Sequence, residues 1–357
     1  SNPINSSKCA TQALEIAEKN NNFTQVTSAL NILGFLHLMS GKYQLALSNF
    51  KQGLKINQDN GDSIQIAIAY NNLGNYYNYR GLKDRALEYY LLSLKLKEKF
   101  GDQRAISVNL TNIGIIYDER GKFNKALKSY EKALLIKKEL KDERGVALVS
   151  TNMGSMYLDY GQFEKAQEYQ NSSLAIYRKI NDLRGIAGCL QQLARIAHHN
   201  GNSDNALQIL DEAKKINTQL KNPTGLNQGH YIIARVYTDL KDYRKALSNC
   251  QTAIKYAKTA GDIEAEIEAW KQLAIIREVD RSPEKALKAF RKATLLNDSL
   301  SNIQNRQYIE KLQVVYETEL KDRKLLLQEQ DITILNQDKK LKIYLITGLI
   351  LIVLLSS

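Results

Sequence analysis

The sequence has few of the residues that build catalytic, metal-binding or disulfide-bonded sites. Its 357 residues include three cysteines, three prolines, one tryptophan and four histidines. Cys9, Cys189 and Cys250 are odd in number and show no CxxC spacing, which argues against a disulfide framework and against a zinc site. No strand pattern is present, so no glycine-rich phosphate loop follows a strand. We therefore expect no catalytic residue and no cofactor in this segment, which we predict is not an enzyme.

Metal and nucleic-acid binding are also disfavoured. The adjacent pair His198-His199 would point in directions about 100° apart on a helix, which is poor geometry for holding one metal ion. The net charge is +12, with 50 basic against 38 acidic residues. No clustered arginine run or zinc spacing accompanies that charge, so we predict no metal site and no nucleic-acid partner for this segment.

What the chain does have is a repeat of 40 residues. Glycine occurs at positions 41, 81, 121, 161 and 201, and alanine at 46, 86, 126, 166, 206, 246 and 286. A unit of this length cannot bury its own apolar face, so neighbouring units have to stack into a solenoid. Such a solenoid offers an extended binding surface, and function is expected along a groove.

Each unit is predicted to hold two helices joined by tight turns. Apolar residues recur at three-to-four spacing before and after Gly121, a residue type that tolerates the left-handed backbone ending a helix. The second break carries an aspartate in five of the units, as in Gly101-Asp102 and Lys141-Asp142. We expect these carboxylates to cap the helix that follows. Glycine or alanine at the phase of Gly114, and alanine at the phase of Ala126, indicate close helix contacts.

These residues resemble the tetratricopeptide repeat (TPR) family. Its signature places W-x2-L-G-x2-Y before A-x3-F. The run Tyr70-Asn71-Asn72-Leu73-Gly74-Asn75-Tyr76-Tyr77, with Ala86 and Tyr90, follows that pattern. The period is 40 residues where the family has about 34, and the closing proline is missing. The chain is therefore similar to the long-repeat branch that includes kinesin light chain and Rap-type bacterial peptide receptors.

The resemblance implies an all-α fold, a right-handed superhelical solenoid of antiparallel helix pairs. A partial repeat helix is expected over 1–20 and seven repeats over 21–300. In this family the first helix of each repeat lines the concave groove, and in the long-repeat relatives asparagines at one phase hold peptides. Carboxamides donate and accept hydrogen bonds, so a ladder of them pairs with an extended peptide backbone. The alternative is that they only bond neighbouring helices or water. The predicted ligand-binding residues are Asn71, Asn72, Asn75, Asn112, Asn152, Gln192 and Arg195.

The last part of the chain departs from the repeat. Residues 301–342 contain neither glycine nor proline, and their spaced apolar residues predict a long connecting helix. Dimerisation through a coiled coil is one expectation for this helix, and capping of the last repeat is the other. The uncharged run Ile343–Leu355 predicts a transmembrane helix over 343–357, which we expect to be truncated because a span needs about 20 residues.

Two functions fit this organisation. By analogy with bacterial membrane-bound sensor histidine kinases, the repeats would be a peptide- or protein-binding input domain, with an output domain beyond residue 357. That architecture places the repeats in the periplasm. Lys339, Lys340 and Lys342 favour the cytoplasm instead, by the rule that positive flanks stay inside. The alternative function is a membrane-tethered scaffold that assembles partner proteins without signalling output.

Overall fold

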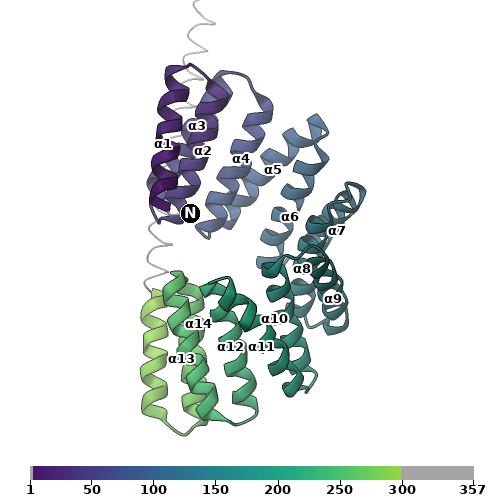
Figure 1. The fold of residues 1–357 in the computed structure, drawn as a ribbon, viewed down its shortest axis with the longest axis vertical. Helices are drawn as coiled ribbons and strands as arrows, with labels where there is room; N and C mark the ends of the chain where they lie inside the picture. Colours follow the sequence, from purple (N-terminus) through teal and green to yellow (C-terminus); the bar gives the residue numbers. More distant parts are fainter. Residues whose placement is uncertain (1–2, 299–357) are drawn as a thin grey trace, which may run out of the picture. The chain divides into compact units, whose positions relative to one another are not determined.

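The computed structural model describes residues 3–298, and these residues fold as successive antiparallel helices with no strand among them (Figure 1). The helices are α1 (Pro3–Lys19), α2 (Phe23–Met39), α3 (Tyr43–Asp59), α4 (Ser63–Tyr79), α5 (Lys83–Phe100), α6 (Gln103–Glu119), α7 (Phe123–Glu139), α8 (Glu143–Asp159), α9 (Phe163–Lys179), α10 (Leu183–His199), α11 (Ser203–Gln219), α12 (Pro223–Asp239), α13 (Tyr243–Ala260) and α14 (Ile263–Val279). A further helical stretch covers 283–298. The predicted all-helical repeat solenoid is confirmed.

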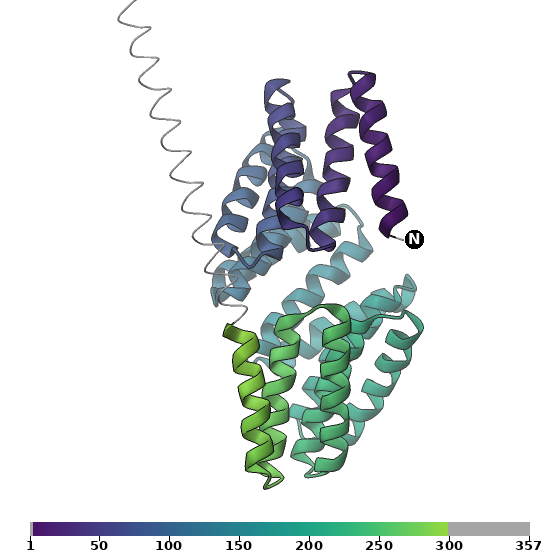
Figure 2. The same cartoon turned by 90° about the vertical axis from the view of Figure 1, so that its left-hand side faces the viewer.

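Residues up to 293 form the first compact unit of the chain, and the described residues 294–298 belong to a second one. Within the first unit each even-numbered helix from α2 to α12 packs against the odd-numbered helix that follows it (Figure 2). Even-numbered helices also contact one another, as α10 does α8 and α12, and as α12 does α14. The even-numbered helices from α6 to α14 therefore form a continuous layer, and α2 contacts α4 in the same way. These helices are the ones expected to line the groove.

Close contacts between paired helices depend on the small residues. A Cβ added to Gly114 in α6 would lie 2.5 Å from the ring of Tyr130 in α7, and one added to Gly74 would lie 2.5 Å from the ring of Tyr90. Both tyrosines are almost fully buried, and Ala126 is completely buried. The prediction that these phases mark close helix contacts is confirmed, because only glycine leaves room for the ring.

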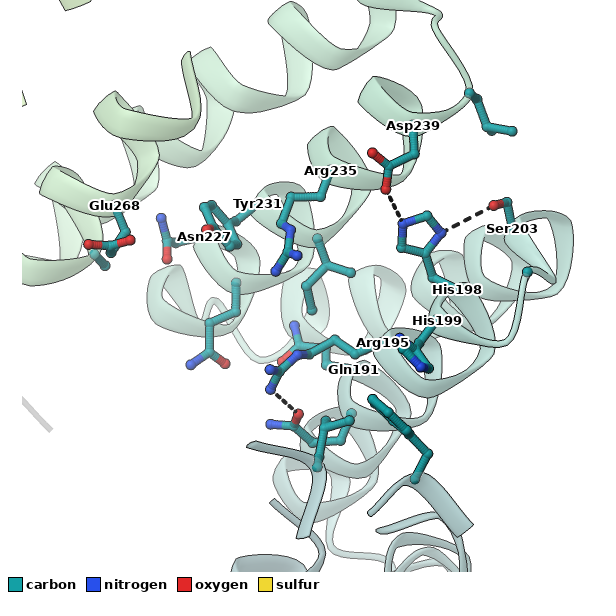
Figure 3. A pocket seen from close by; sticks show the side chains of 18 residues that line it. Gln191, Arg195, His198, His199, Ser203, Asn227, Tyr231, Arg235, Asp239 and Glu268 are labelled. Carbon is teal, nitrogen blue, oxygen red and sulfur yellow. Dashed lines mark hydrogen bonds and ion pairs between the residues drawn. The ribbon is translucent and has the colours of Figure 1, made fainter. Parts of the chain in front are cut away.

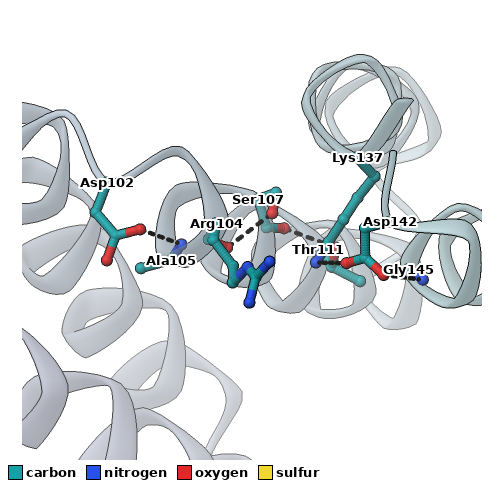
Figure 4. A network of polar contacts seen from close by, with 8 residues as sticks. All are labelled: Asp102, Arg104, Ala105, Ser107, Thr111, Lys137, Asp142 and Gly145. Atoms are coloured by element: carbon teal, nitrogen blue, oxygen red, sulfur yellow. Dashed lines mark hydrogen bonds and ion pairs between the residues drawn. The ribbon is translucent and has the colours of Figure 1, made fainter. Parts of the chain in front are cut away.

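The turns hold the predicted aspartate caps (Figure 4). Asp102 accepts a hydrogen bond from the backbone N–H of Ala105 at 3.0 Å, and Asp142 accepts one from Gly145 at 2.9 Å. Asp62, Asp182 and Asp262 cap α4, α10 and α14 in the same way. These caps satisfy backbone donors that would otherwise be unpaired at the start of five even-numbered helices. In α2 and α12 the capping residue is an asparagine, Asn22 or Asn222.

One cap is also part of a partly buried ion pair that the sequence did not predict. Lys137, near the end of α7, donates to Asp142 at 2.6 Å, and its side chain is 9% exposed. This hydrogen bond lowers the pKa of the Asp142 carboxyl below its usual value. Lys97 occupies the same place one repeat earlier, and there burial lowers the lysine pKa to about 8. Lys97 donates to the side chain of Asn109 rather than to the capping aspartate.

No helix within residues 3–298 is both long and apolar enough to cross a membrane. The predicted connecting helix over 301–342, its coiled-coil dimer and the predicted transmembrane helix over 343–357 all lie outside the described residues.

Candidate functional site

A groove of about 840 Å³ opens on the layer of even-numbered helices (Figure 3). Its polar lining comes mainly from α10, α12 and α14, while Leu158 of α8 and Phe163 of α9 add apolar surface. Polar residues in the lining include Gln191, Gln192, Arg195, Tyr231, Arg235 and Glu268. Because the lining repeats at a spacing of 40 residues, the same helix face is presented by successive repeats.

Two predicted site residues, Gln192 and Arg195, line this groove together. Arg195 donates to the side-chain oxygen of Gln192 at 2.8 Å and pairs with Asp159 of α8 at 3.1 Å. The guanidinium thus joins α8 to α10 while remaining partly exposed. The neighbouring Gln191 is 3% exposed and donates to the backbone oxygen of Gly225 at 2.6 Å, so its amide holds α10 against α12.

The five predicted asparagines lie on α4, α6 and α8, away from the lining of this pocket. Asn75 accepts a hydrogen bond from the Tyr90 hydroxyl at 2.7 Å, which ties α4 to α5. The side-chain oxygen of Asn71 is buried and has no hydrogen-bond partner. A buried acceptor of this kind is costly, so each such atom is a point where a ligand or water would gain free energy by binding.

The other three asparagines share the phase of Gln192. Asn72 is buried, whereas Asn112 and Asn152 are half-buried. Within the described part of the chain, none of the three side chains forms a hydrogen bond to another residue. Their carboxamides are therefore not used to hold neighbouring helices together, and they remain able to donate and accept.

The two adjacent histidines have separate partners. His198 contacts the Ser203 hydroxyl through Nδ1 at 3.1 Å and Asp239 through Nε2 at 2.7 Å. The His199 ring stacks on Phe163 with centroids 3.5 Å apart. A serine, a histidine and an aspartate in contact, here Ser203, His198 and Asp239, resemble a hydrolase triad. The Asp239 side chain is 67% exposed, however, and so does not form the buried pair with histidine that such a triad uses. The grouping instead ties α10 to α11 and α12 at the edge of the groove.

An acidic group lies on α6 and α8, one repeat before Arg195. Asp118 and Glu119 end α6, and Asp159 ends α8. Burial, together with the negative charges of Asp159 and Glu119, raises the pKa of the Asp118 carboxyl to about 6. The layer of even-numbered helices is therefore acidic at the ends of α6 and α8 and carries two arginines on α10 and α12.

Sequence reasoning missed Tyr231, Arg235 and Glu268. Arg235 stands 40 residues after Arg195, and that shared phase was the signal for it. Glu268 shares the phase of Val108 and Leu148, which do not resemble it chemically. Repeat phase alone therefore indicates which positions face the groove, even where the residue type changes from one repeat to the next.

Comparison with known proteins identifies the family. A family model described as a tetratricopeptide repeat matches residues 25–99 and 102–179, and a second model with that description matches 228–259. Together these matches cover more than half of the chain, which belongs to the tetratricopeptide repeat family. Repeats of this family act as scaffolds and regulators, in agreement with the prediction that this segment is not an enzyme. No curated protein matches the sequence.

Several solved structures share the fold. The apo form of the quorum sensor NprR from B. thuringiensis has a TM-score of 0.66 and 19% identity, over 82% of this chain and 83% of that one. The Rap conjugation gene regulator of plasmid pLS20, in complex with the Phr* peptide, has a TM-score of 0.66 and 10% identity, over 80% and 78%. BtubC (BKLC) from P. vanneervenii has a TM-score of 0.55 and 22% identity, over 62% and 93%.

Proposed function

We propose that this chain is a peptide-binding domain that holds an extended peptide along the layer of even-numbered helices. The observation that carries the proposal is the groove on α10, α12 and α14, continued on α4, α6 and α8 by the side chains of Asn72, Asn112 and Asn152, which have no hydrogen-bond partner among the described residues. An extended peptide has unpaired backbone N–H and C=O groups, and carboxamides can satisfy both.

The structural neighbours support this choice of ligand. The pLS20 regulator is in complex with a peptide, and another Rap protein of similar fold is in complex with competence and sporulation factor. Both resemble this chain in fold at 10% and 15% identity. Binding of a peptide by this chain is supported by its own groove residues together with that shared fold.

The finer proposal is that the domain is the input part of a membrane-anchored signalling protein, with the repeats in the periplasm. The sequence supports it through the uncharged run at 343–355 that follows the repeats. Protease treatment of membrane vesicles of known orientation tests the location. In inside-out vesicles periplasmic repeats would be protected, whereas digestion of the repeats would place them in the cytoplasm and favour a tethered scaffold.

Peptide binding is tested by measuring affinities for binders selected from a random peptide library. Replacing both Asn112 and Asn152 by alanine removes two carboxamides, each worth about 1 kcal/mol, and is expected to weaken binding about 30-fold. Asn124→Ala is the matched control, because Asn124 is an exposed amide on α7, outside the even-numbered layer. Equal affinities for the double variant and the control would contradict the proposed role of the amides.

A further inference from the structure

The lining of the even-numbered layer changes character along the chain. We define the groove face as the positions that share a phase with the lining residues Gln228, Gln192, Arg195 and His199. On α2, α4, α6 and α8 this face carries large apolar side chains whose exposed fractions range from 36% to 72%. These are Ile32, Phe35, Met39, Ile68, Tyr79, Val108 and Leu148. The same face also carries two acids, Glu119 at the end of α6 and Asp159 at the end of α8.

These exposed apolar side chains on one face of successive helices are a surface on which an apolar ligand segment can be buried. On α4, α6 and α8 one of these apolar residues, Ile68, Val108 or Leu148, lies one turn before Asn72, Asn112 or Asn152, respectively. An arrangement of amides among apolar side chains fits a peptide whose backbone bonds to the amides while its apolar side chains pack between them.

The groove face of α10 and α12 carries two arginines, Arg195 and Arg235, and one acid, Asp239. Arg235 is exposed, lines the groove and makes neither an ion pair nor a hydrogen bond with any residue in 3–298. In Figure 3 its guanidinium points into the groove, on the same side as that of Arg195. The nearby acids already have partners: Asp159 pairs with Arg195, Asp239 with His198 and Glu268 with Lys271.

An unpaired guanidinium in such a groove favours one kind of ligand group. Its fixed fork of donors matches a carboxylate in a bidentate geometry, and hydrogen bonds to charged groups are about twice as strong as neutral ones. Tyr231 and Ile232 line the groove one turn before Arg235. The positive charge and the fork of donors favour a carboxylate over a neutral group.

We propose that the groove binds peptides that combine an apolar segment, seated on α2 to α8, with a carboxylate, seated on Arg235 beside Arg195. This inference rests on the proposed peptide-binding function and adds the chemical class and the orientation of the ligand. Neighbouring helices of the layer are about 10 Å apart, so α8 and α12 are separated by about six residues of extended chain. The carboxylate is either the C-terminus of the peptide or an Asp or Glu side chain.

The test uses the full chain and an array of random peptides of about twelve residues, each made with a free acid and with an amidated C-terminus. We expect bound peptides to be enriched in apolar residues at one end and in a carboxylate at the other. Loss of binding on amidation identifies the C-terminus as the source. Loss of binding on exchange of Asp and Glu for Asn and Gln identifies a side chain.

Variants assign the two halves of the groove. Arg235→Gln is expected to weaken the binding of peptides with a carboxylate about tenfold or more, and to leave the affinity for their amidated or neutral versions unchanged. Leu148→Ser is expected to weaken the binding of peptides with the apolar segment. Leu135→Ser is its control, because Leu135 is an exposed leucine on α7. Each variant is first checked for unchanged helical content and melting temperature.

The outcomes separate the two proposals. Bound peptides with no preference for a carboxylate, or equal binding by Arg235→Gln and the unchanged chain, overturn this inference and leave peptide binding standing. If Leu148→Ser leaves peptide binding unaffected, the part of the inference that seats an apolar segment on α2 to α8 is overturned. If the chain binds no peptide in the array, both the proposed function and this inference fail.

Discussion

Removing the carboxylate of Asp142 tests how the even-numbered helices are held in place. This carboxylate caps α8 through Gly145 and pairs with Lys137, whose side chain is 9% exposed. Loss of an N-cap costs about 1 kcal/mol. Removing one partner of a buried ion pair costs about 3–5 kcal/mol, because the remaining charge is left without compensation. We expect Asp142→Ala to lower the free energy of unfolding by about 4–6 kcal/mol in total.

Asp62→Ala is the matched control. Asp62 caps α4 by the same hydrogen bond to Gln65, but the residue in the place of Lys137 is the neutral Asn57. Asp62→Ala is expected to lower the free energy of unfolding by about 1 kcal/mol. Adding Lys137→Met to Asp142→Ala removes the stranded charge and is expected to restore about 3 kcal/mol of the loss, as coupled residues do in a double-mutant cycle.

The assay is urea unfolding followed by circular dichroism, repeated across the acidic range. Hydrogen bonding lowers the folded-state pKa of Asp142. A lowered carboxyl pKa gives stability that is present above the unfolded pKa and lost as the pH falls through the folded value. The difference in free energy of unfolding between Asp142→Ala and the unchanged chain is therefore expected to become smaller in strong acid. Equal losses for Asp142→Ala and Asp62→Ala, or no recovery with Lys137→Met, would refute the reasoning.

Two further outcomes are expected. Asp118 has a folded-state pKa raised to about 6, so its ionisation destabilises the fold as the pH rises from about 4 to about 6. Compared with the unchanged chain, Asp118→Asn is expected to melt at a higher temperature at pH 7 and at the same temperature below pH 4. Identical melting temperatures of the two proteins at both pH values would contradict this. Ala126 is completely buried, so Ala126→Leu overpacks the contact of α6 with α7 and is expected to cost about 1–3 kcal/mol. Lys122→Leu, at the exposed start of α7, is expected to leave thermal melting unchanged.

The amino-acid sequence by itself determined the repeat, the positions of the turns and the helix caps. These follow from residues close to one another in the chain, such as Asp102 with Ala105, whose hydrogen bond is fixed once a helix starts there. The identity of the family followed from the same regular positions. The phases facing the groove were also readable, because a helix with a fixed repeat presents the same positions in every unit.

The tertiary structure decided which of those positions are free to bind. Asn75 and Gln191 carry the same functional group as Asn112 and Gln192, yet they are occupied by Tyr90 and by the backbone of Gly225. Arg195 and Arg235 share a phase, but only Arg195 has an acidic partner on the preceding even-numbered helix. The periodic pattern gives the direction of a side chain, whereas its partner stands 15 to 36 residues away in the chain. Whether a polar group is satisfied depends on the packing of neighbouring helices, which no local pattern contains.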